Sequence, residues 1–363
     1  MIDSILLAPY WLSLKLRHLM FDRGIRKVHR SGVPSVCIGN ITVGGTGKTP
    51  HTEMLLGILK DHPVWKDLHI AVLSRGYRRR SSGFQVVDTA GTAEQYGDEP
   101  MQIKKKFPDT VVAVDKDRIE GCRLLEEGVD GQAGADLVIL DDAFQYRSLK
   151  ADFNIVLMDY GRPVYKDHLL PLGRLRDLPE RVSAADVVIV TKCPAYLDEW
   201  RRGMIAENLG FGGEIFFTKT SYDELKSVFP EGDPRYIHSQ RLILFSGIAN
   251  DSPMMRYLGD SYRIVRHISF SDHHRFSSGD IEKIGKAAAK FPTAVIVTTE
   301  KDSQRILDCK DIPDRLKERM FYLPIRSEFI SGQDKDRFIQ TFEKYISPSR
   351  QGHHSAPGQT PRV

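Results

Sequence analysis

The strongest chemical signal in the sequence is a glycine-rich segment that ends in a Lys-Thr pair. Residues 42–49 read Thr-Val-Gly-Gly-Thr-Gly-Lys-Thr and lie between a short apolar run and a helix-like stretch that begins at Pro50. A strand, a glycine-rich loop, Lys-Thr and a helix in this order form the context of a phosphate-binding loop (P-loop). Main-chain N–H groups and the helix N-terminus can surround phosphate oxygens, and Lys48 can reach the β- and γ-phosphates. The residues expected to bind a nucleotide are Thr42, Val43, Gly44, Gly45, Thr46, Gly47, Lys48 and Thr49.

Metal-binding groups are expected beside this loop. The Thr49 hydroxyl can bind Mg²⁺, and an acidic pair, Asp141 and Asp142, follows the apolar run 137–140. An acid at the end of a neighbouring strand commonly holds Mg²⁺, directly or through water, although an aspartate after a buried strand can also cap a helix. Residues 191–194 (Thr-Lys-Cys-Pro) lack the aspartate of a guanine-reading motif. We therefore expect ATP, together with Mg²⁺, as the cofactor.

The elements that must position these groups follow from the alternation of short apolar runs and helix-like stretches after residue 30. This pattern predicts a mostly parallel sheet with flanking helices. The first set of candidate strands covers residues 35–38, 70–73, 111–114, 137–140, 155–158, 187–190 and 215–217. A second set, after a polar stretch that contains Pro and Gly, covers residues 242–245, 264–268, 294–297 and 320–323. We predict an α/β fold of the P-loop NTPase type with a second, smaller α/β domain.

The composition excludes several classes of protein. The chain has 363 residues, of which 41 % are hydrophobic and 28 % are charged, so it can bury full cores and is not wholly disordered. No apolar run reaches the roughly 20 residues that a membrane-spanning helix needs. The four cysteines lie far apart, without the spacing of a zinc site, which is typical of a reducing cytoplasm.

The net charge is concentrated at the N-terminus. Residues 1–30 contain six Lys or Arg and two Asp or Glu residues, which accounts for the whole net charge of +4. Because the charges balance elsewhere and no reading motif is present, nucleic-acid binding is not expected. We predict an amphipathic helix on the membrane surface, with Leu7, Trp11, Leu14 and Phe21 toward lipid and the cations toward anionic head groups. The alternative is an ordinary amphipathic helix packed on the protein's own core.

Nine segments, taken in chain order, carry a more specific signal. They are residues 40–50, 74–77, 97–100, 117–118, 141–145, 170–176, 246–248, 270–274 and 299–302. Together they resemble the tetraacyldisaccharide 4′-kinase family, the lipid A 4′-kinases of Gram-negative bacteria, whose P-loop also begins with threonine. The sequence departs from the family pattern at Ala143 and Tyr146, where the family usually has glycine and histidine.

The resemblance implies an ATP-dependent kinase that phosphorylates the 4′-hydroxyl of a tetraacyldisaccharide 1-phosphate, a membrane-borne lipid. It points to Asp98 as the base that accepts the hydroxyl proton and to His273 as its partner, beside Lys48 on the phosphates. A helix cap and a surface histidine are the structural alternatives for this pair, and a place in the first turn of a helix is the alternative for Glu99. The expected metal ligands are Thr49, Glu99, Asp141, Asp142 and Gln145, and the candidates for clamping a phosphate are Arg118 and Arg174.

The predicted organisation combines these observations. The expected ranges are a membrane-associated helix over residues 1–30, a P-loop kinase domain over 31–218, a linker over 219–240, a smaller C-terminal α/β domain over 241–347 and a disordered tail over 348–363. Asp98 and His273 then fall in different domains, so that domain closure would complete the site. The expected partners are the lipid substrate and an anionic membrane surface, at the cytoplasmic face of the inner membrane, with no nucleic acid and no protein partner implied. Two other functions stay open: a kinase for a small polar acceptor, and a nucleotide-dependent membrane-surface switch or assembly factor without a lipid acceptor.

Overall fold

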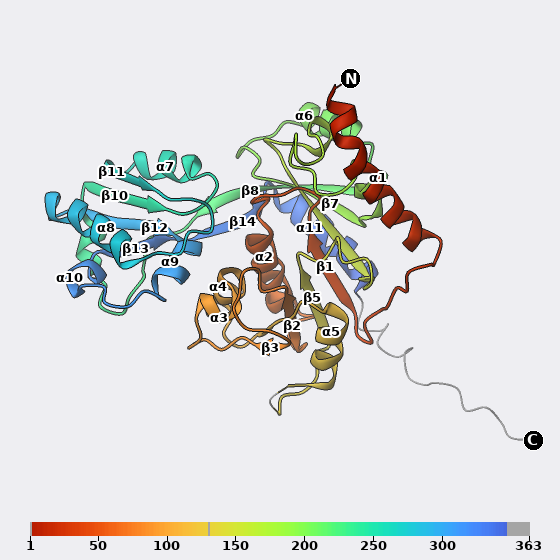
Figure 1. Cartoon of the computed structure of the whole chain (residues 1–363), viewed down its shortest axis with the longest axis horizontal. Coiled ribbons are helices and arrows are strands. Elements are labelled where there is room, and N and C mark those ends of the chain that lie inside the picture. The colour runs from red at the N-terminus through yellow and green to blue at the C-terminus, as the bar shows by residue number, and fades with distance from the viewer. Residues whose placement is uncertain (1, 130, 347–363) are drawn as a thin grey trace, which may run out of the picture. The chain divides into compact units, whose positions relative to one another are not determined.

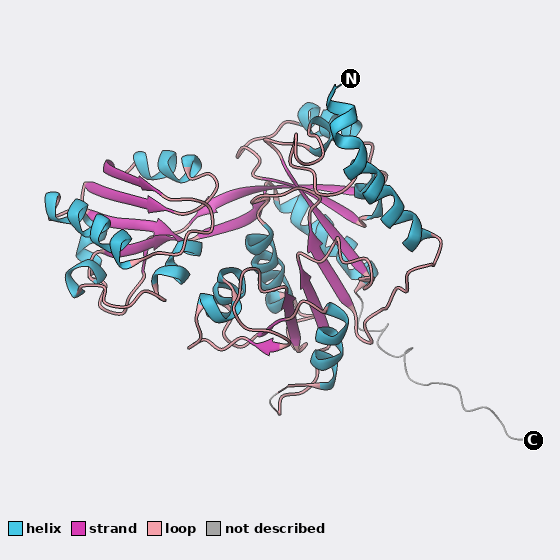
Figure 2. Cartoon of the chain, viewed as in Figure 1, coloured by secondary structure: helices cyan, strands magenta, loops and turns pink. Residues whose placement is uncertain are grey.

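The structure is a computed structural model that describes residues 2–129 and 131–346, so the tail predicted at 348–363 lies outside the described residues. Two sheets with helices against their faces make up this part of the chain (Figures 1 and 2). The predicted α/β fold is confirmed.

The first sheet has nine strands in the order β14-β8-β7-β6-β1-β5-β2-β4-β3. They are β1 (Ser35–Gly39), β2 (Ile70–Ser74), β3 (Gln85–Val86), β4 (Val111–Val114), β5 (Leu137–Asp141), β6 (Phe153–Asp159), β7 (Val187–Thr191), β8 (Glu214–Tyr222) and β14 (Ile325–Phe329). Strand β1 runs parallel to both of its neighbours, β5 and β6. The strands β1, β2, β5 and β7 are buried along their whole length, as expected for apolar runs in a parallel sheet that is covered on both faces. The carboxyl ends of β1 and β5 therefore meet at one edge of the sheet, where α/β proteins commonly bind ligands.

The second sheet has five strands in the order β11-β10-β12-β13-β9. They are β9 (Lys226–Ser227), β10 (Arg241–Ser246), β11 (Arg263–Ser269), β12 (Val295–Thr299) and β13 (Met320–Leu323). Four of them match the predicted second set, and β9 pairs antiparallel with β13. The stretch 219–240, expected as a linker, contains the end of β8, all of β9 and a short helix, η3 (Pro234–His238). The polar character of this stretch agrees with the exposure of both residues of β9.

Helices cover the sheets and begin where the sequence supplies a cap or a free amide end. They are α1 (Ile2–Asp22), α2 (Lys48–Asp61), α3 (Ala93–Tyr96), α4 (Asp98–Lys106), α5 (Arg118–Glu127), α6 (Glu199–Leu209), α7 (Ser252–Gly259), α8 (Ser278–Lys290), α9 (Glu300–Ile306), α10 (Asp314–Lys317) and α11 (Gly332–Tyr345), with the short helices η1 (Val164–Lys166) and η2 (Pro179–Ala184). The side chains of Asp117 and Ser277, for example, accept hydrogen bonds from the first N–H groups of α5 and α8.

The chain divides into two compact units, each built from separate segments. Among the described residues, unit 1 comprises 2–75, 110–219 and 327–346, and unit 2 comprises 76–109 and 220–326. The predicted ranges were continuous, whereas residues 76–109 join the later segment and residues 327–346 return to unit 1. Two of the crossings fall inside the strands β8 and β14. The crossing at 219/220 lies one residue from the predicted boundary at 218/219, where a polar stretch begins, whereas no boundary was expected at 326/327.

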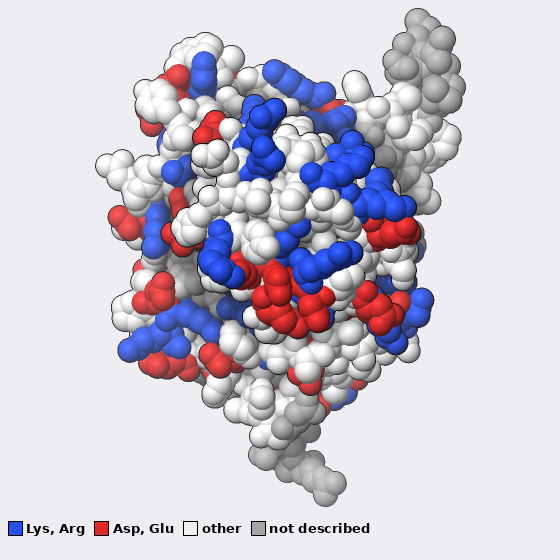
Figure 3. All heavy atoms as spheres, turned by 90° about the vertical axis from the view of Figure 1, so that its left-hand side faces the viewer, with Lys and Arg blue, Asp and Glu red and all other residues white. Residues whose placement is uncertain are grey.

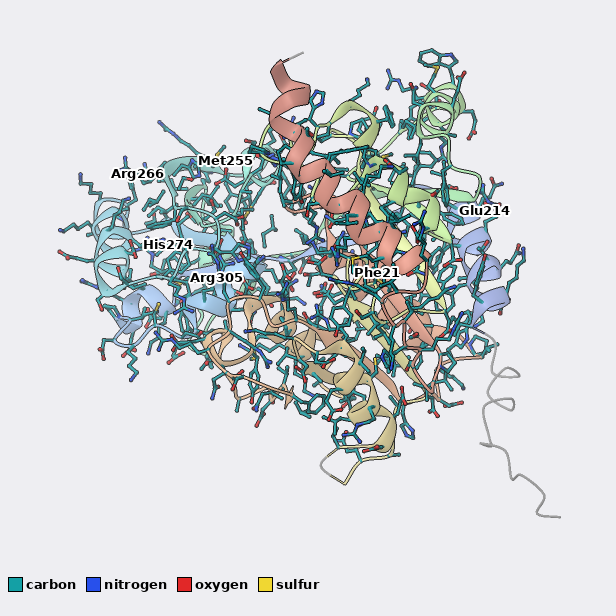
Figure 4. The ribbon with its side chains drawn as sticks, turned by 45° about the vertical axis from the view of Figure 1, so that its right-hand side comes forward. Phe21, Glu214, Met255, Arg266, His274 and Arg305 are labelled. Atoms are coloured by element: carbon teal, nitrogen blue, oxygen red, sulfur yellow. The ribbon has the colours of Figure 1, made fainter. Side chains whose placement is uncertain are left out.

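Helix α1 is held on unit 1 by apolar and polar contacts. Leu14 and Phe21, the latter labelled in Figure 4, are both buried. His18 is also buried, and its Nε2 lies 2.6 Å from Oδ1 of Asp177. Two residues that we expected to face lipid, Leu14 and Phe21, therefore belong to the protein core.

A different apolar row of α1 faces outward. Leu12, Leu16 and Leu19 are exposed, at spacings of four and three residues that place them on one face, and Trp11 is exposed beside them.

No helix within residues 2–129 and 131–346 has both the length and the apolar character needed to cross a membrane. On the face drawn in Figure 3, Lys and Arg side chains are interspersed with Asp and Glu.

Candidate active site

The P-loop joins β1 to α2 and leaves the first N–H groups of α2 available. Gly44 (φ +105°) and Gly47 (φ +89°) adopt left-handed conformations that favour glycine. Helix α2 begins at Lys48, and no side chain of the described chain caps it. Its uncapped amide end is therefore suited to an anion. The guanidinium of Arg174 lies beside the loop, because a Cβ added at Gly44 would be 3.5 Å from its Nη1.

Two carbonyl groups of the P-loop are held from behind. The Thr191 hydroxyl donates to the carbonyl of Thr46 at 2.9 Å, and Nδ1 of His51 donates to the carbonyl of Gly47 at 2.7 Å. Burial lowers the pKa of His51 to about 4, so its imidazole is neutral at pH 7. In a trans peptide the N–H points opposite to the C=O. The N–H groups of Gly47 and Lys48 are therefore turned away from these two side chains, as a phosphate cradle requires.

The unusual threonine at the start of the loop takes part in a buried polar network. Asn40 is fully buried, and its amide nitrogen donates to the hydroxyls of Thr46 at 2.7 Å and Thr42 at 3.3 Å. Its amide oxygen accepts from Nη2 of Arg176 at 2.5 Å. Thr42 thus supplies a hydrogen-bonding group that glycine lacks.

The acidic pair after β5 lies close to the lysine of the P-loop. Asp141 is fully buried at the end of β5, and its Oδ2 accepts from the Ser74 hydroxyl at 3.2 Å. Oδ2 of Asp142 is 3.7 Å from Nζ of Lys48, and its carboxylate also pairs with Arg176. Burial alone would raise the pKa of Asp142, but Lys48 and Arg176 reverse this effect and hold it below its usual value. Asp142 therefore presents an ionised carboxylate beside the loop.

The remaining sequence-predicted residues of unit 1 lie around this pair. Gln145 donates through its amide nitrogen to the carbonyl of Asn40. Arg118 is buried, with its guanidinium carbon 5.4 Å from the centre of the Tyr146 ring. The Tyr146 hydroxyl donates to Oδ1 of Asp117 at 3.1 Å. The tyrosine that replaces the family's usual histidine thus packs against one of the two arginines proposed for phosphate.

In unit 2, Asp98 is buried at the start of α4 among positive groups. Oδ2 accepts from Nε of Arg305 at 3.0 Å and also from its Nη2. Nδ1 of His273 is 3.4 Å from this oxygen, and Nζ of Lys301 is 3.7 Å away. Burial would raise the pKa of Asp98, but Lys301, His273 and Arg305 outweigh it and hold the pKa far below its usual range. Asp98 is therefore an ionised acceptor at neutral pH.

The segment 299–302, to which no mechanistic role could be assigned from the sequence, organises this carboxylate. Asp302 is fully buried, and its Oδ2 accepts from the Thr299 hydroxyl at 2.7 Å and from the N–H of Gly247 at 2.8 Å. Its Oδ1 accepts from Nη1 of Arg305 at 2.7 Å. Arg305, labelled in Figure 4, is thus held between two carboxylates. Sequence reasoning missed it, because its partner Asp98 lies 207 positions away along the chain.

Lys301 and His273, the two other groups near Asp98, are themselves held in place by further contacts. Glu99 pairs with Lys301 at 2.8 Å through Oε1. His273 has a positive φ of +58°, and its N–H donates to the carbonyl of Gly247 at 3.0 Å. The ring of Tyr77 meets the imidazole edge-on, with 5.4 Å between centroids. The backbone and the ring contact together orient the His273 side chain.

The structure therefore brings the predicted residues together in two groups. Unit 1 holds the P-loop residues 42–49 with Arg118, Asp141, Asp142, Gln145 and Arg174, and unit 2 holds Asp98, Glu99 and His273. Asp98 and His273 were expected in different domains, whereas both belong to unit 2. The reason is that α4, in the segment 76–109, packs against α9. The pair is formed within one unit and needs no domain closure to assemble.

Comparisons with known proteins agree over nearly the whole chain. The family model described as tetraacyldisaccharide-1-P 4′-kinase matches residues 4–346. A tetraacyldisaccharide 4′-kinase of Parabacteroides distasonis is 36 % identical over 353 residues, covering 95 % of this chain and 94 % of the relative. One from Phocaeicola vulgatus is 38 % identical and covers 93 % of this chain and 92 % of its own. A crystal structure of LpxK from Aquifex aeolicus in complex with ATP is similar with a TM-score of 0.70 and 25 % identity, over 95 % of this chain and 100 % of that one.

Proposed function

Since this chain belongs to the tetraacyldisaccharide-1-P 4′-kinase family of lipid A biosynthesis, we propose that it transfers the γ-phosphoryl group of ATP to the 4′-hydroxyl of a membrane-borne tetraacyldisaccharide 1-phosphate. The observation that carries the proposal is the buried carboxylate of Asp98, which Arg305, Lys301 and His273 keep ionised in a chain that also has a complete P-loop. An ionised acceptor and a phosphate cradle are the two parts that phosphoryl transfer to a hydroxyl needs.

The nucleotide binds in unit 1, with its phosphates on the N–H groups at the start of α2 and on Lys48. The oxygen ligands beside the loop fit Mg²⁺, because Thr49, Asp141 and Asp142 offer a hydroxyl and two carboxylates. Within the described residues no group of three or more His, Cys, Asp or Glu side chains is placed to hold a metal ion by itself, so phosphate oxygens and water would complete the coordination. When bound, Mg²⁺ neutralises charge on the phosphates.

Two further metal candidates are weaker, because their polar groups already have partners. Gln145 donates through its amide nitrogen to the Asn40 carbonyl, and Glu99 pairs with Lys301 in unit 2. Gln145 can still offer its amide oxygen. For Glu99 we favour a role in holding Lys301 near Asp98.

Asp98 accepts the hydrogen bond of the attacking 4′-hydroxyl and orients this group for the transfer. Its low pKa makes it a poor final proton acceptor, so we assign the proton to His273, whose Nδ1 lies 3.4 Å from the same carboxylate oxygen. In a loose phosphoryl-transfer transition state the hydroxyl proton leaves late, and orientation matters more than base strength. Arg305 and Lys301 keep Asp98 in the charged form.

The two arginines proposed for phosphate differ in access. Arg174 is exposed beside Gly44, and a guanidinium matches phosphate oxygens bidentately, so it is the better candidate for direct contact. Arg118 is buried and packs on Tyr146. We propose that Arg118 acts on the nucleotide site through its charge.

We assign the membrane contact to the outward row of α1, at the cytoplasmic face of the inner membrane. Leu12, Leu16 and Leu19 would enter the interface, with Trp11 at the level of the head groups. This peripheral position would bring the enzyme to a substrate that lies in the same bilayer. A peripheral contact of this kind is consistent with a membrane-borne lipid substrate and does not require a membrane-spanning helix.

Mass spectrometry of the lipid tests the proposed reaction. The full-length protein is incubated with Mg-ATP and a tetraacyldisaccharide 1-phosphate in detergent, and the expected product carries one added phosphate. Asp98→Asn should abolish the product while leaving ATP binding intact. ATP hydrolysis without a phosphorylated lipid would refute the lipid kinase and favour the nucleotide-dependent switch. Phosphorylation of a small polar acceptor, but not of the lipid, would favour a kinase for a small polar acceptor.

A further inference from the structure

A buried histidine lies one helical turn beyond the P-loop and has no part in the chemistry described above. His51 is on α2, and only 3 % of its surface is exposed. Its backbone N–H donates to the carbonyl of Gly47 at 3.1 Å, and its ring reaches the same carbonyl through Nδ1 at 2.7 Å. One side chain thus adds a second hydrogen bond at the peptide that ends the P-loop.

The opposite edge of the imidazole contacts the sheet. Nε2 lies 2.9 Å from the hydroxyl of Thr218, which is fully buried in β8. Because the Gly47 carbonyl can only accept, Nδ1 carries the ring proton, and the lone pair of Nε2 accepts from Thr218. The Ser327 hydroxyl, in β14, is 3.1 Å from Nδ1.

The two sheet partners stand at special positions along the chain. Thr218 is the next-to-last residue of the second segment of unit 1, and Ser327 is the first residue of its third segment. The chain passes from unit 1 to unit 2 in β8 and returns in β14. His51 therefore touches the P-loop on one side and both crossing strands on the other.

We propose that His51 is a positioning residue for the nucleotide, which ties the Gly47 carbonyl to Thr218 and Ser327 and thereby sets the direction of the Lys48 N–H. The peptide between Gly47 and Lys48 carries both groups, so a rotation that moves the carbonyl also moves the N–H. The proposal rests on nucleotide binding by the P-loop. It adds that the affinity of the loop depends on hydroxyls of β8 and β14.

Substitutions that keep one edge of the ring separate the two contacts. His51→Asn can place an amide donor near the position of Nδ1, whereas His51→Gln reaches the position of Nε2, and His51→Phe keeps the ring shape without either polar group. Thr218→Val and Ser327→Ala each remove one hydroxyl. Binding of ATP to the full-length variants is measured by isothermal titration calorimetry, and the melting temperature is recorded for each.

We expect His51→Phe and His51→Gln to raise the Kd for ATP about tenfold, the loss of one hydrogen bond worth ~1.4 kcal/mol. His51→Asn should raise the Kd by only about threefold, because it retains the donor to Gly47 but loses the contact with Thr218. Thr218→Val should weaken binding in the parent but not in His51→Phe, since the ring that transmits its effect is then absent. The KM for the lipid should not change in any of these variants.

The control is His62→Phe at the other end of the same helix, where the ring packs against Trp65. It should change the melting temperature without changing the Kd for ATP. The proposal is overturned if His51→Phe folds and binds ATP like the parent, if His51→Asn binds as weakly as His51→Phe, or if Thr218→Val acts equally in both backgrounds. Should His51→Phe fail to fold, the hydroxyl variants Thr218→Val and Ser327→Ala decide, and unchanged affinity in both overturns the proposal. Direct ATP binding needs no lipid acceptor, so a failure of the proposed kinase reaction would leave this test intact.

Discussion

Replacement of Arg305 by methionine should expose how Asp98 is stabilised. Arg305 donates twice to Asp98 and once to Asp302, and all three side chains are buried. The variant leaves two carboxylates that have lost a common cation, with Lys301 3.7 Å from Asp98 as the nearest remaining one. Methionine has a similar length, so the main loss is electrostatic.

The size of the effect follows from the burial of the pair. Removing one partner of a buried ion pair costs about 3–5 kcal/mol of unfolding free energy, because the other charge stays in a poorly solvated place. Adding Asp98→Asn to Arg305→Met removes one of the stranded charges and should return about 2 kcal/mol. Turnover should fall by a factor of about 10² or more in Arg305→Met, and the second change should not restore it.

Urea unfolding measures the stability part, and the lipid kinase assay measures turnover. The matched control is Arg319→Met, since Arg319 is equally buried in unit 2 but, among the residues that the structure describes, donates only to the main-chain carbonyls of Ala288, Phe291 and Ala294. Adding Asp98→Asn to the control should give an additive result. The reasoning is refuted if Asp98→Asn destabilises Arg305→Met as much as it destabilises the parent.

Three shorter predictions follow from other parts of the structure. Lys48→Ala should lower both ATP affinity and turnover, whereas Asp98→Ala should lower turnover alone; a nucleotide-binding assay beside the kinase assay checks this difference. Leu16→Glu should release the protein from anionic vesicles in a pelleting assay, and Leu307→Glu, an exposed leucine of unit 2, should not; equal pelleting of both would contradict the membrane role of α1. The pKa of His51 is about 4 in the folded chain against 6.5 ordinarily, so the unfolded chain binds more protons in this window, and unfolding free energy should fall by up to about 3 kcal/mol from pH 7 to pH 4. Urea unfolding at a series of pH values measures this effect, and His51→Asn should lack the part of the pH dependence that comes from His51.

The strands that the sequence predicted well are those with continuous apolar runs. Strands β1, β2, β5 and β7 are buried at every residue, and each prediction agreed within one residue. The strands β3 and β9 have two residues each, too few for a periodic signal. Strand β14 was missed because it has only five residues, and its three central residues, Arg-Ser-Glu, are all polar, so it shows neither an apolar run nor an alternation.

The candidate site was predictable where its residues form a local motif. The P-loop and the acids after β5 could be found because each is a short segment whose chemistry is readable in isolation. Arg305 and His51 could not, because their partners are far away along the chain: Asp98 is separated from Arg305 by 207 positions, and Thr218 from His51 by 167. A single sequence carries no information on such pairings unless a known family supplies it.

The interleaved segments of the two units also determine the order in which the protein can mature during translation. At about 5–20 residues per second, α9 is synthesised roughly 10–40 seconds after α4. During this interval the Asp98 carboxylate has neither Arg305 nor Lys301 and stays hydrated. Unit 1 must likewise wait for β14 and α11. Neither unit can be completed by an early part of the nascent chain, because both include segments that lie beyond residue 219.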